Sequence, residues 1–222
     1  FRLEEDSPFA NLVTAMMDLL VELRDEQEAK FVKGAYDFWE ASYASEPDET
    51  PDSWEPFIEG DQSLRDFMFC LESGHALLAR LLLAKATDDH DFFPNSKGLR
   101  RYFDELGGFS GNIELDAYPV AANGMIEDMR NQLVQSLFED DIFIWWTDGY
   151  GEQTASQHDN PYTRFRDVAK DGSEVSRVSP ATRERFSRAI AHVSFAVLKF
   201  DFAEIEGDPL GDLYQRYFDP ET

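Results

Sequence analysis

Two Ser-Pro pairs, Ser7-Pro8 and Ser179-Pro180, each stand directly before a run of apolar residues with helical spacing. Serine is a favoured N-cap, and proline is tolerated at the first helical position because its missing N–H would have no intrahelical partner there. Apolar residues at intervals of three and four follow both pairs. The stripes are Phe9, Leu12, Val13, Met16, Leu20 and Leu23 in the first run, and Phe186, Ile190, Val193 and Val197 in the second. The sequence therefore predicts two helices that start at residues 8 and 180.

Similar stripes recur along the rest of the chain, whereas strand-type alternation persists nowhere for more than a few residues. They indicate helices within 31–43, 64–82, 96–108, 126–137 and 209–218; the polar segment 24–30 leaves open whether the first two stripes form one helix or two. The run "IFIWW" at 142–146 could form a brief strand, but no partner strand is evident. We expect a mainly α fold, an irregular multi-helix bundle with long loops and little or no sheet.

Two segments read as long loops and suggest how the chain is divided. Residues 45–61 hold three prolines and many acidic side chains, and residues 148–178 carry Gly, Asn, Pro and Ser without periodicity. One division is an N-terminal helical segment with an acidic, proline-rich loop at 1–61, followed by a helical domain at 62–222. The pattern also allows all residues to form one domain.

The charge balance favours a protein from a concentrated salt solution. The chain has 45 acidic and 20 basic residues, a formal net charge of −25, and the acids are spread along its whole length. Such a surface keeps a protein soluble in high salt, where self-repulsion is screened. No apolar run approaches the ~18 residues of a membrane span. A single cysteine, Cys70, in an apolar run suggests a buried, reduced thiol. We expect a cytoplasmic protein of a halophile-like source, with no membrane association.

Motifs for catalysis or metal binding do not emerge from the sequence. It has no glycine-rich phosphate loop, no CxxC and no HExxH. His75 falls on the apolar face of a predicted helix, which favours a core histidine over a catalytic one. We expect neither catalytic nor metal-ligating residues. A stand-alone helical enzyme that uses carboxylates stays an alternative, although no set of catalytic residues can be named for it.

One region reverses the local charge. Between Tyr162 and Arg188, seven cations oppose four acids, a local charge of +3. On the predicted helix that starts at Pro180, Arg185, Arg188, His192 and Lys199 lie within about 60° of one another, opposite the apolar stripe. Arginine suits phosphate because its planar fork donates two hydrogen bonds. We therefore select candidate DNA contacts; the alternative is that these side chains satisfy acidic neighbours within the fold. The candidates are Arg164, Arg166, Arg183, Arg185, Arg188 and Lys199.

Three stretches together resemble a known family. They are "HALLARLLLAKATDDHDFFP" at 75–94, "FEDDIFIWWTDGY" at 138–150 and, most specifically, "FDFAEIEGDPLGDLYQRYFDPET" at 200–222. They resemble the helical region ahead of the catalytic domain in large adenine-specific DNA methyltransferases of type I and type IIG restriction-modification systems. The resemblance implies a methylase domain after Thr222, with S-adenosylmethionine as its cofactor and none bound in these 222 residues. The methylase motifs themselves are absent from the sequence, so no catalytic residue is carried over.

Two hypotheses about function follow. In the first, the chain is the non-catalytic N-terminal helical domain of such an enzyme, which links domains and contacts DNA. Leu210, Tyr214, Tyr217 and Phe218 would then face the chain's own methylase domain, and a specificity or nuclease subunit is a candidate partner. In the second, it is an acidic protein-interaction domain that docks a partner subunit around Trp39, Trp54, Trp145 and Trp146.

Overall fold

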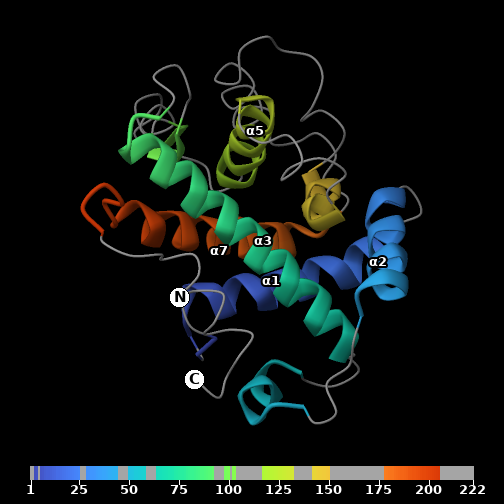
Figure 1. Ribbon diagram of the computed structural model, residues 1–222. Coiled ribbons are helices and arrows are strands. Elements are labelled where there is room, and N and C mark those ends of the chain that lie inside the picture. The colour runs from blue at the N-terminus through green and yellow to red at the C-terminus, as the bar shows by residue number, and fades with distance from the viewer. Residues whose placement is uncertain are drawn as a thin grey trace.

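Helices account for all regular structure in the part of the chain that the computed structural model describes. The described residues are 3–4, 6–25, 29–44, 50–58, 64–92, 98–100, 102–103, 117–132, 142–150 and 178–205, and they contain no β-strand. This confirms the mainly α fold. Figure 1 shows α3 running diagonally across α1 and α7, with α5 above them and α2 at one side. The elements are α1 (Pro8–Asp25), α2 (Lys30–Ser42), the 3₁₀ helix η1 (Asp52–Phe57), α3 (Leu64–Asp89), α5 (Ala117–Gln132), the 3₁₀ helix η3 (Ile142–Tyr150) and α7 (Pro180–Leu198).

The two Ser-Pro pairs begin helices, as the sequence predicts. The Ser7 hydroxyl accepts a hydrogen bond from the Ala10 backbone N–H at 3.1 Å, at the start of α1. The Ser179 hydroxyl likewise accepts from the Thr182 backbone N–H at 3.3 Å, with Pro180 as the first residue of α7. Each serine thus satisfies a donor that would otherwise lack a partner inside the helix. The polar segment left open in the sequence separates two helices, because α1 ends at Asp25 and α2 begins at Lys30.

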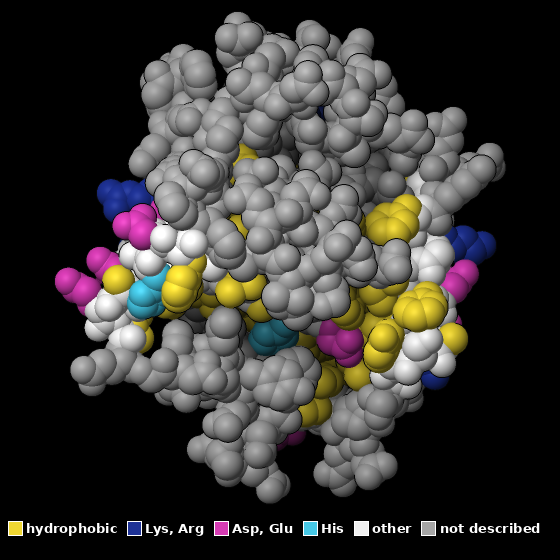
Figure 2. Space-filling view, turned by 45° about the horizontal axis from the view of Figure 1, so that its top comes forward, with side chains coloured by type: hydrophobic (Ala, Val, Ile, Leu, Met, Phe, Trp, Pro, Cys, Tyr) yellow, Lys and Arg dark blue, Asp and Glu magenta, His cyan; other side chains and the backbone are white. Residues whose placement is uncertain are grey.

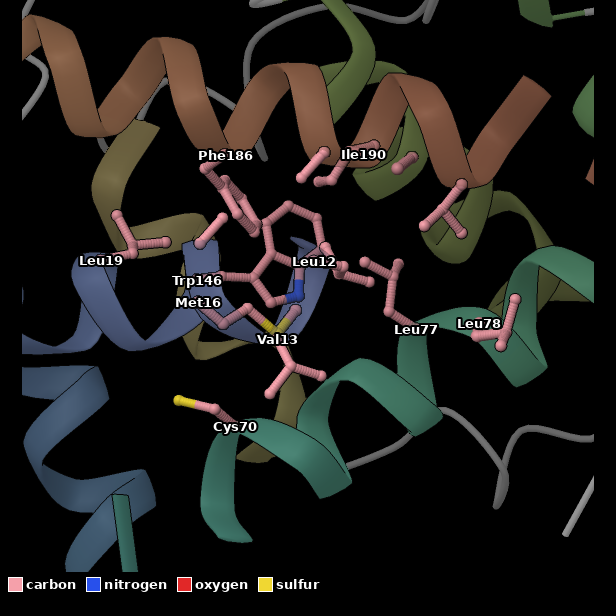
Figure 3. Close-up of a cluster of buried hydrophobic side chains, with 14 of the residues drawn as sticks. Leu12, Val13, Met16, Leu19, Cys70, Leu77, Leu78, Trp146, Phe186 and Ile190 are labelled. Atoms are coloured by element: carbon pink, nitrogen blue, oxygen red, sulfur yellow. The ribbon is translucent and has the colours of Figure 1, made fainter. Parts of the chain in front are cut away.

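The centre of the core lies where α1 is enclosed by α3, α7 and η3. Leu12, Val13 and Met16 of α1 are fully buried, and α7 packs along α1 more extensively than any other described helix does. Figure 3 shows the Trp146 indole lying among side chains from α1, α3 and α7. Burying large apolar side chains of this kind is worth about 1.5–3 kcal/mol each, so this junction supplies much of the stability of the bundle.

The run "IFIWW" is part of η3 and not a strand. Trp145 and Trp146 are both buried, and the Trp145 indole N–H donates to the Ser73 hydroxyl at 2.8 Å. The Trp145 ring also stacks on Phe69, with ring centroids 5.5 Å apart. A short helical turn directs both indoles into the core, whereas a strand would have pointed one of them away.

Burial also corrects the predicted docking surface. Trp39, Trp145 and Trp146 have at most 1% of their surface exposed, because their rings fill the spaces between helices. They therefore cannot form a surface for a partner. Trp54 is half-buried in η1 and packs against Phe67 of α3, with ring centroids 5.3 Å apart. The acidic segment 45–61, predicted as a loop, thus contains a short helix that α3 anchors through aromatic contacts.

Residues on both sides of position 61 contribute to one hydrophobic cluster that spans α1, α2, α3, α5, η3 and α7. The division into 1–61 and 62–222 stays a prediction.

Helix α3 is long and apolar enough to cross a membrane by length and composition, with a mean hydropathy of 1.4 over its most apolar window. In this fold 67% of that window is buried within the protein, where α3 packs against α1, α5, η3 and α7.

Candidate nucleic-acid interface

Helix α7 separates a buried apolar face from an exposed face that carries positive charge. Phe186, Ile190, Val193 and Val197 are buried against the rest of the bundle. The opposite face exposes residues spaced by three and four, which lie within about 80° of one another around the helix. We call this set the α7 stripe; its members are Arg185, Arg188, His192, Phe195 and Lys199. From Pro180 to Lys199, four cations oppose one acid, a local charge of +3 in a chain whose total is −25.

The two arginines of the α7 stripe form ion pairs with acidic neighbours. Arg185 pairs with Asp18 of α1, and Arg188 pairs with Glu184 one turn earlier on α7. The alternative was that these side chains pair with acidic residues within the fold, and such a pair is observed at both positions. The Arg185 and Arg188 side chains nevertheless keep 62% and 56% of their surface exposed.

These exposed pairs are weak and can exchange partners. Ion pairs in water contribute about 0–1 kcal/mol, and salt screens them further. A phosphate group could therefore replace Asp18 or Glu184 at little cost, and the guanidinium fork would gain two hydrogen bonds in return. Lys199 closes α7 as its C-cap and is exposed, and the structure gives it no ion pair with a described residue.

Among the described residues, Arg183 is a predicted contact that does not join this surface. Arg183 is partly buried, and its position on α7 is about 160° away from that of Arg185 around the helix axis. Arg164 and Arg166 lie outside the described residues. The predicted domain-interface residues Leu210, Tyr214, Tyr217 and Phe218 lie outside them as well. Of the six candidate DNA contacts, the structure therefore brings Arg185, Arg188 and Lys199 onto one face.

A shallow groove of about 390 Å³ lies between α1 and α7, next to Arg185. Glu22 lines it and binds the N-terminus of α7. Its carboxylate accepts hydrogen bonds from the Ser179 backbone N–H at 2.6 Å, the Ser179 hydroxyl at 2.8 Å and the Thr182 hydroxyl at 2.5 Å. Partial burial raises the pKa of Glu22, but these hydrogen bonds outweigh it and lower the pKa below its ordinary value. The protein's own carboxylate thus occupies the position that an anion would take at this helix end.

The role of Glu22 could not be predicted, because its partners lie 157 and 160 residues further along the chain. Phe195 was also missed as a member of the α7 stripe. Its spacing, three residues after His192 and four before Lys199, could have identified it.

Two further charged clusters are internal to the bundle. Asp66 is buried and binds both Arg24 and the Tyr36 hydroxyl, the latter at 2.8 Å. Nearby, burial and the negative charge of Asp66 raise the pKa of the Cys70 thiol well above its ordinary value, as expected for an unreactive core cysteine. The second cluster is the Lys85–Asp89 pair at the end of α3. No group of three His, Cys, Asp or Glu residues suited to a metal ion occurs among the residues described.

Comparison with protein-family models, with curated proteins and with solved structures finds no match for this chain.

Proposed function

We propose that this chain is a non-catalytic helical domain of a DNA adenine methyltransferase or restriction-modification protein, and that it contacts the DNA backbone through the α7 stripe. The observation that carries the proposal is the exposed face of α7, where Arg185, Arg188 and Lys199 project together from a strongly acidic protein. Cations aligned on one helix face are the electrostatic footprint of a phosphate-binding surface.

The acidic remainder of the chain would orient this contact. A net charge of −25 repels nucleic acid from most of the surface, so DNA would approach where the local charge is reversed. In concentrated salt that repulsion is screened, but the gain from counterion release is also reduced. The α7 stripe would then position DNA, while sequence recognition would come from other parts of the enzyme.

The resemblance of segment 200–222 supports the wider setting of the proposal. It implies a methylase domain that binds S-adenosylmethionine. The surface that would contact this domain consists of Leu210, Tyr214, Tyr217 and Phe218. DNA, this methylase domain and a specificity or nuclease subunit would be the partners, in the cytoplasm of an organism with high internal salt.

DNA affinity of a charge-neutralised variant tests the proposal. We expect the double substitution R185Q/R188Q to weaken binding of the 222-residue chain to duplex DNA by about tenfold and to lower the salt dependence by about two counterions. The matched control is K33Q/R65Q, which removes two exposed cations from α2 and the start of α3. Arg65 suits this purpose because it forms an exposed ion pair with Glu40, as the α7 arginines do with their acids. Equal affinity of both variants would contradict the proposal.

A second candidate function is docking of a partner subunit, and exposed aromatic side chains on α2 and at its C-cap favour it. Phe31, Phe38 and Tyr43 expose 42%, 52% and 60% of their surface, and the Phe38 and Tyr43 rings contact each other edge to face. Figure 2 shows hydrophobic side chains exposed on the right, the side on which α2 lies in Figure 1. This surface differs from the tryptophans predicted for the same role. Docking predicts that F31S/F38S releases a co-purifying subunit, whereas R185Q/R188Q retains it.

A further inference from the structure

Phe195 stands inside the α7 stripe, with Arg188 and His192 before it and the cation Lys199 after it along the chain. It exposes 49% of its surface, although phenylalanine is usually buried. His192 precedes it by three residues and Lys199 follows it by four, so both side chains neighbour the ring on the helix surface. Arg188 lies one further turn toward the N-terminus on the same exposed face.

The ring of Phe195 is supported from behind by helix α5. It contacts the Tyr118 ring, with centroids 5.7 Å apart and planes tilted by 60°. Tyr118 is itself 5% exposed and stacks on Phe103, with centroids 5.1 Å apart. This row of three rings holds Phe195 at the surface, so a ligand that stacks on it loses little side-chain entropy.

An exposed aromatic ring among cations matches the chemistry of an unstacked nucleobase. Proteins that bind single-stranded nucleic acid combine positive charge along the backbone with aromatic side chains on which bases stack. The cations of the α7 stripe would hold phosphates on both sides of the ring, and the ring face would take the base between them. Stacking tolerates any base, because each has a flat aromatic face.

We infer that Phe195 is a stacking contact for an unpaired nucleobase, so that the α7 stripe prefers single-stranded or locally opened DNA to intact duplex. The inference rests on the proposed function, because it requires that DNA approach α7. It adds a preference for the state of the DNA that phosphate contacts alone would not produce.

The test compares F195A with the original chain in binding to fluorescein-labelled oligonucleotides, measured by fluorescence anisotropy. The probes are a single strand of about 16 nucleotides, within the range that such binding surfaces cover, and the duplex of the same sequence. We expect F195A to weaken single-strand binding by about tenfold and duplex binding much less, and F195W to restore single-strand binding. The matched control F31A removes a phenylalanine of similar exposure, 42%, from α2 and should leave both DNA affinities unchanged.

R188Q distinguishes the inference from the proposed function. If R188Q weakens binding to both probes while F195A changes neither, or changes both equally, the stacking inference is overturned and the proposed function stands. If the original chain binds neither probe, or if R188Q and F195A both leave binding unchanged, both are overturned. Circular dichroism of each variant verifies that the helices are intact.

Discussion

His75 is a half-buried histidine of α3, and its ring lies 4.7 Å from that of Phe9. Burial lowers the pKa of His75 from 6.5 to about 4, so the side chain is neutral in the folded protein at pH 7. The unfolded chain binds more protons than the folded chain between these two values. We therefore expect His75 to cost stability as the pH falls from about 6.5 to about 4, by at most about 3 kcal/mol, and less where water reaches the ring.

Urea unfolding of the original chain and of H75Q across this pH window measures the effect. Glu72 lies one turn earlier, and burial raises its pKa despite a hydrogen bond from the Trp39 indole. Because both proteins contain Glu72, the difference between their unfolding free energies reports on His75 alone. Below pH 4 the difference should become constant. A difference that does not change between pH 6.5 and pH 4 would show that His75 keeps its ordinary pKa.

Asp66 is a buried carboxylate that joins three helices. It pairs with Arg24 of α1, accepts a hydrogen bond from Tyr36 of α2 and lies in the first turn of α3. We expect D66N to lower the free energy of unfolding by about 2–3 kcal/mol, because it removes the charge that compensates Arg24 at a buried position. Y36F removes one hydrogen bond and should cost about 1 kcal/mol. Urea denaturation measures both, and equal costs would contradict the central role of the carboxylate.

At the scale of elements, local capping signals predicted helix starts, whereas apolar runs were ambiguous. Ser7-Pro8 and Ser179-Pro180 located the starts of α1 and α7 because an N-cap acts within one turn. The run 142–146 could not be assigned, since a short apolar run has no periodicity to separate strand from helix. The burial of Asp66 was also not predictable, because Arg24 and Tyr36 lie 42 and 30 residues away in sequence.

A buried ion pair at the end of α3 is linked to the segment that follows α7. Lys85 is 2% exposed and pairs with Asp89, which also accepts a hydrogen bond from the Phe202 backbone N–H at 2.9 Å. D89N would leave the Lys85 charge buried and uncompensated, so we expect it to cost about 3 kcal/mol of unfolding free energy. Adding K85M to D89N should recover part of this loss. A double variant as unstable as D89N would contradict the pairing.

At the scale of the whole molecule, the net charge of −25 predicts that salt stabilises the fold. Raising potassium chloride from about 0.1 M to about 1 M shortens the Debye length from ~10 Å to ~3 Å and so removes most repulsion between surface acids. We expect the thermal unfolding midpoint to rise by about 5 °C or more over this range. A midpoint that stays constant or falls would argue against adaptation to high salt.

The candidate interface was predictable only in part. Helical spacing placed Arg185, Arg188 and Lys199 on one face because that face is set by the backbone of a single helix. The partner of Arg185 could not be predicted, since Asp18 comes from α1, 167 residues earlier in the chain. The same limit applies to Phe195, whose support by Tyr118 depends on how α5 packs against α7.

The most direct test of a DNA contact at α7 is site-specific photocrosslinking. A benzophenone-bearing amino acid replaces His192, which is exposed in the middle of the α7 stripe, and in a second protein it replaces Lys33, which is exposed on α2. Each protein is irradiated with labelled DNA under conditions where binding is measured independently. The proposed contact predicts crosslinked DNA from position 192 and little from position 33. Bound DNA that crosslinks from position 33 but not from position 192 would contradict it.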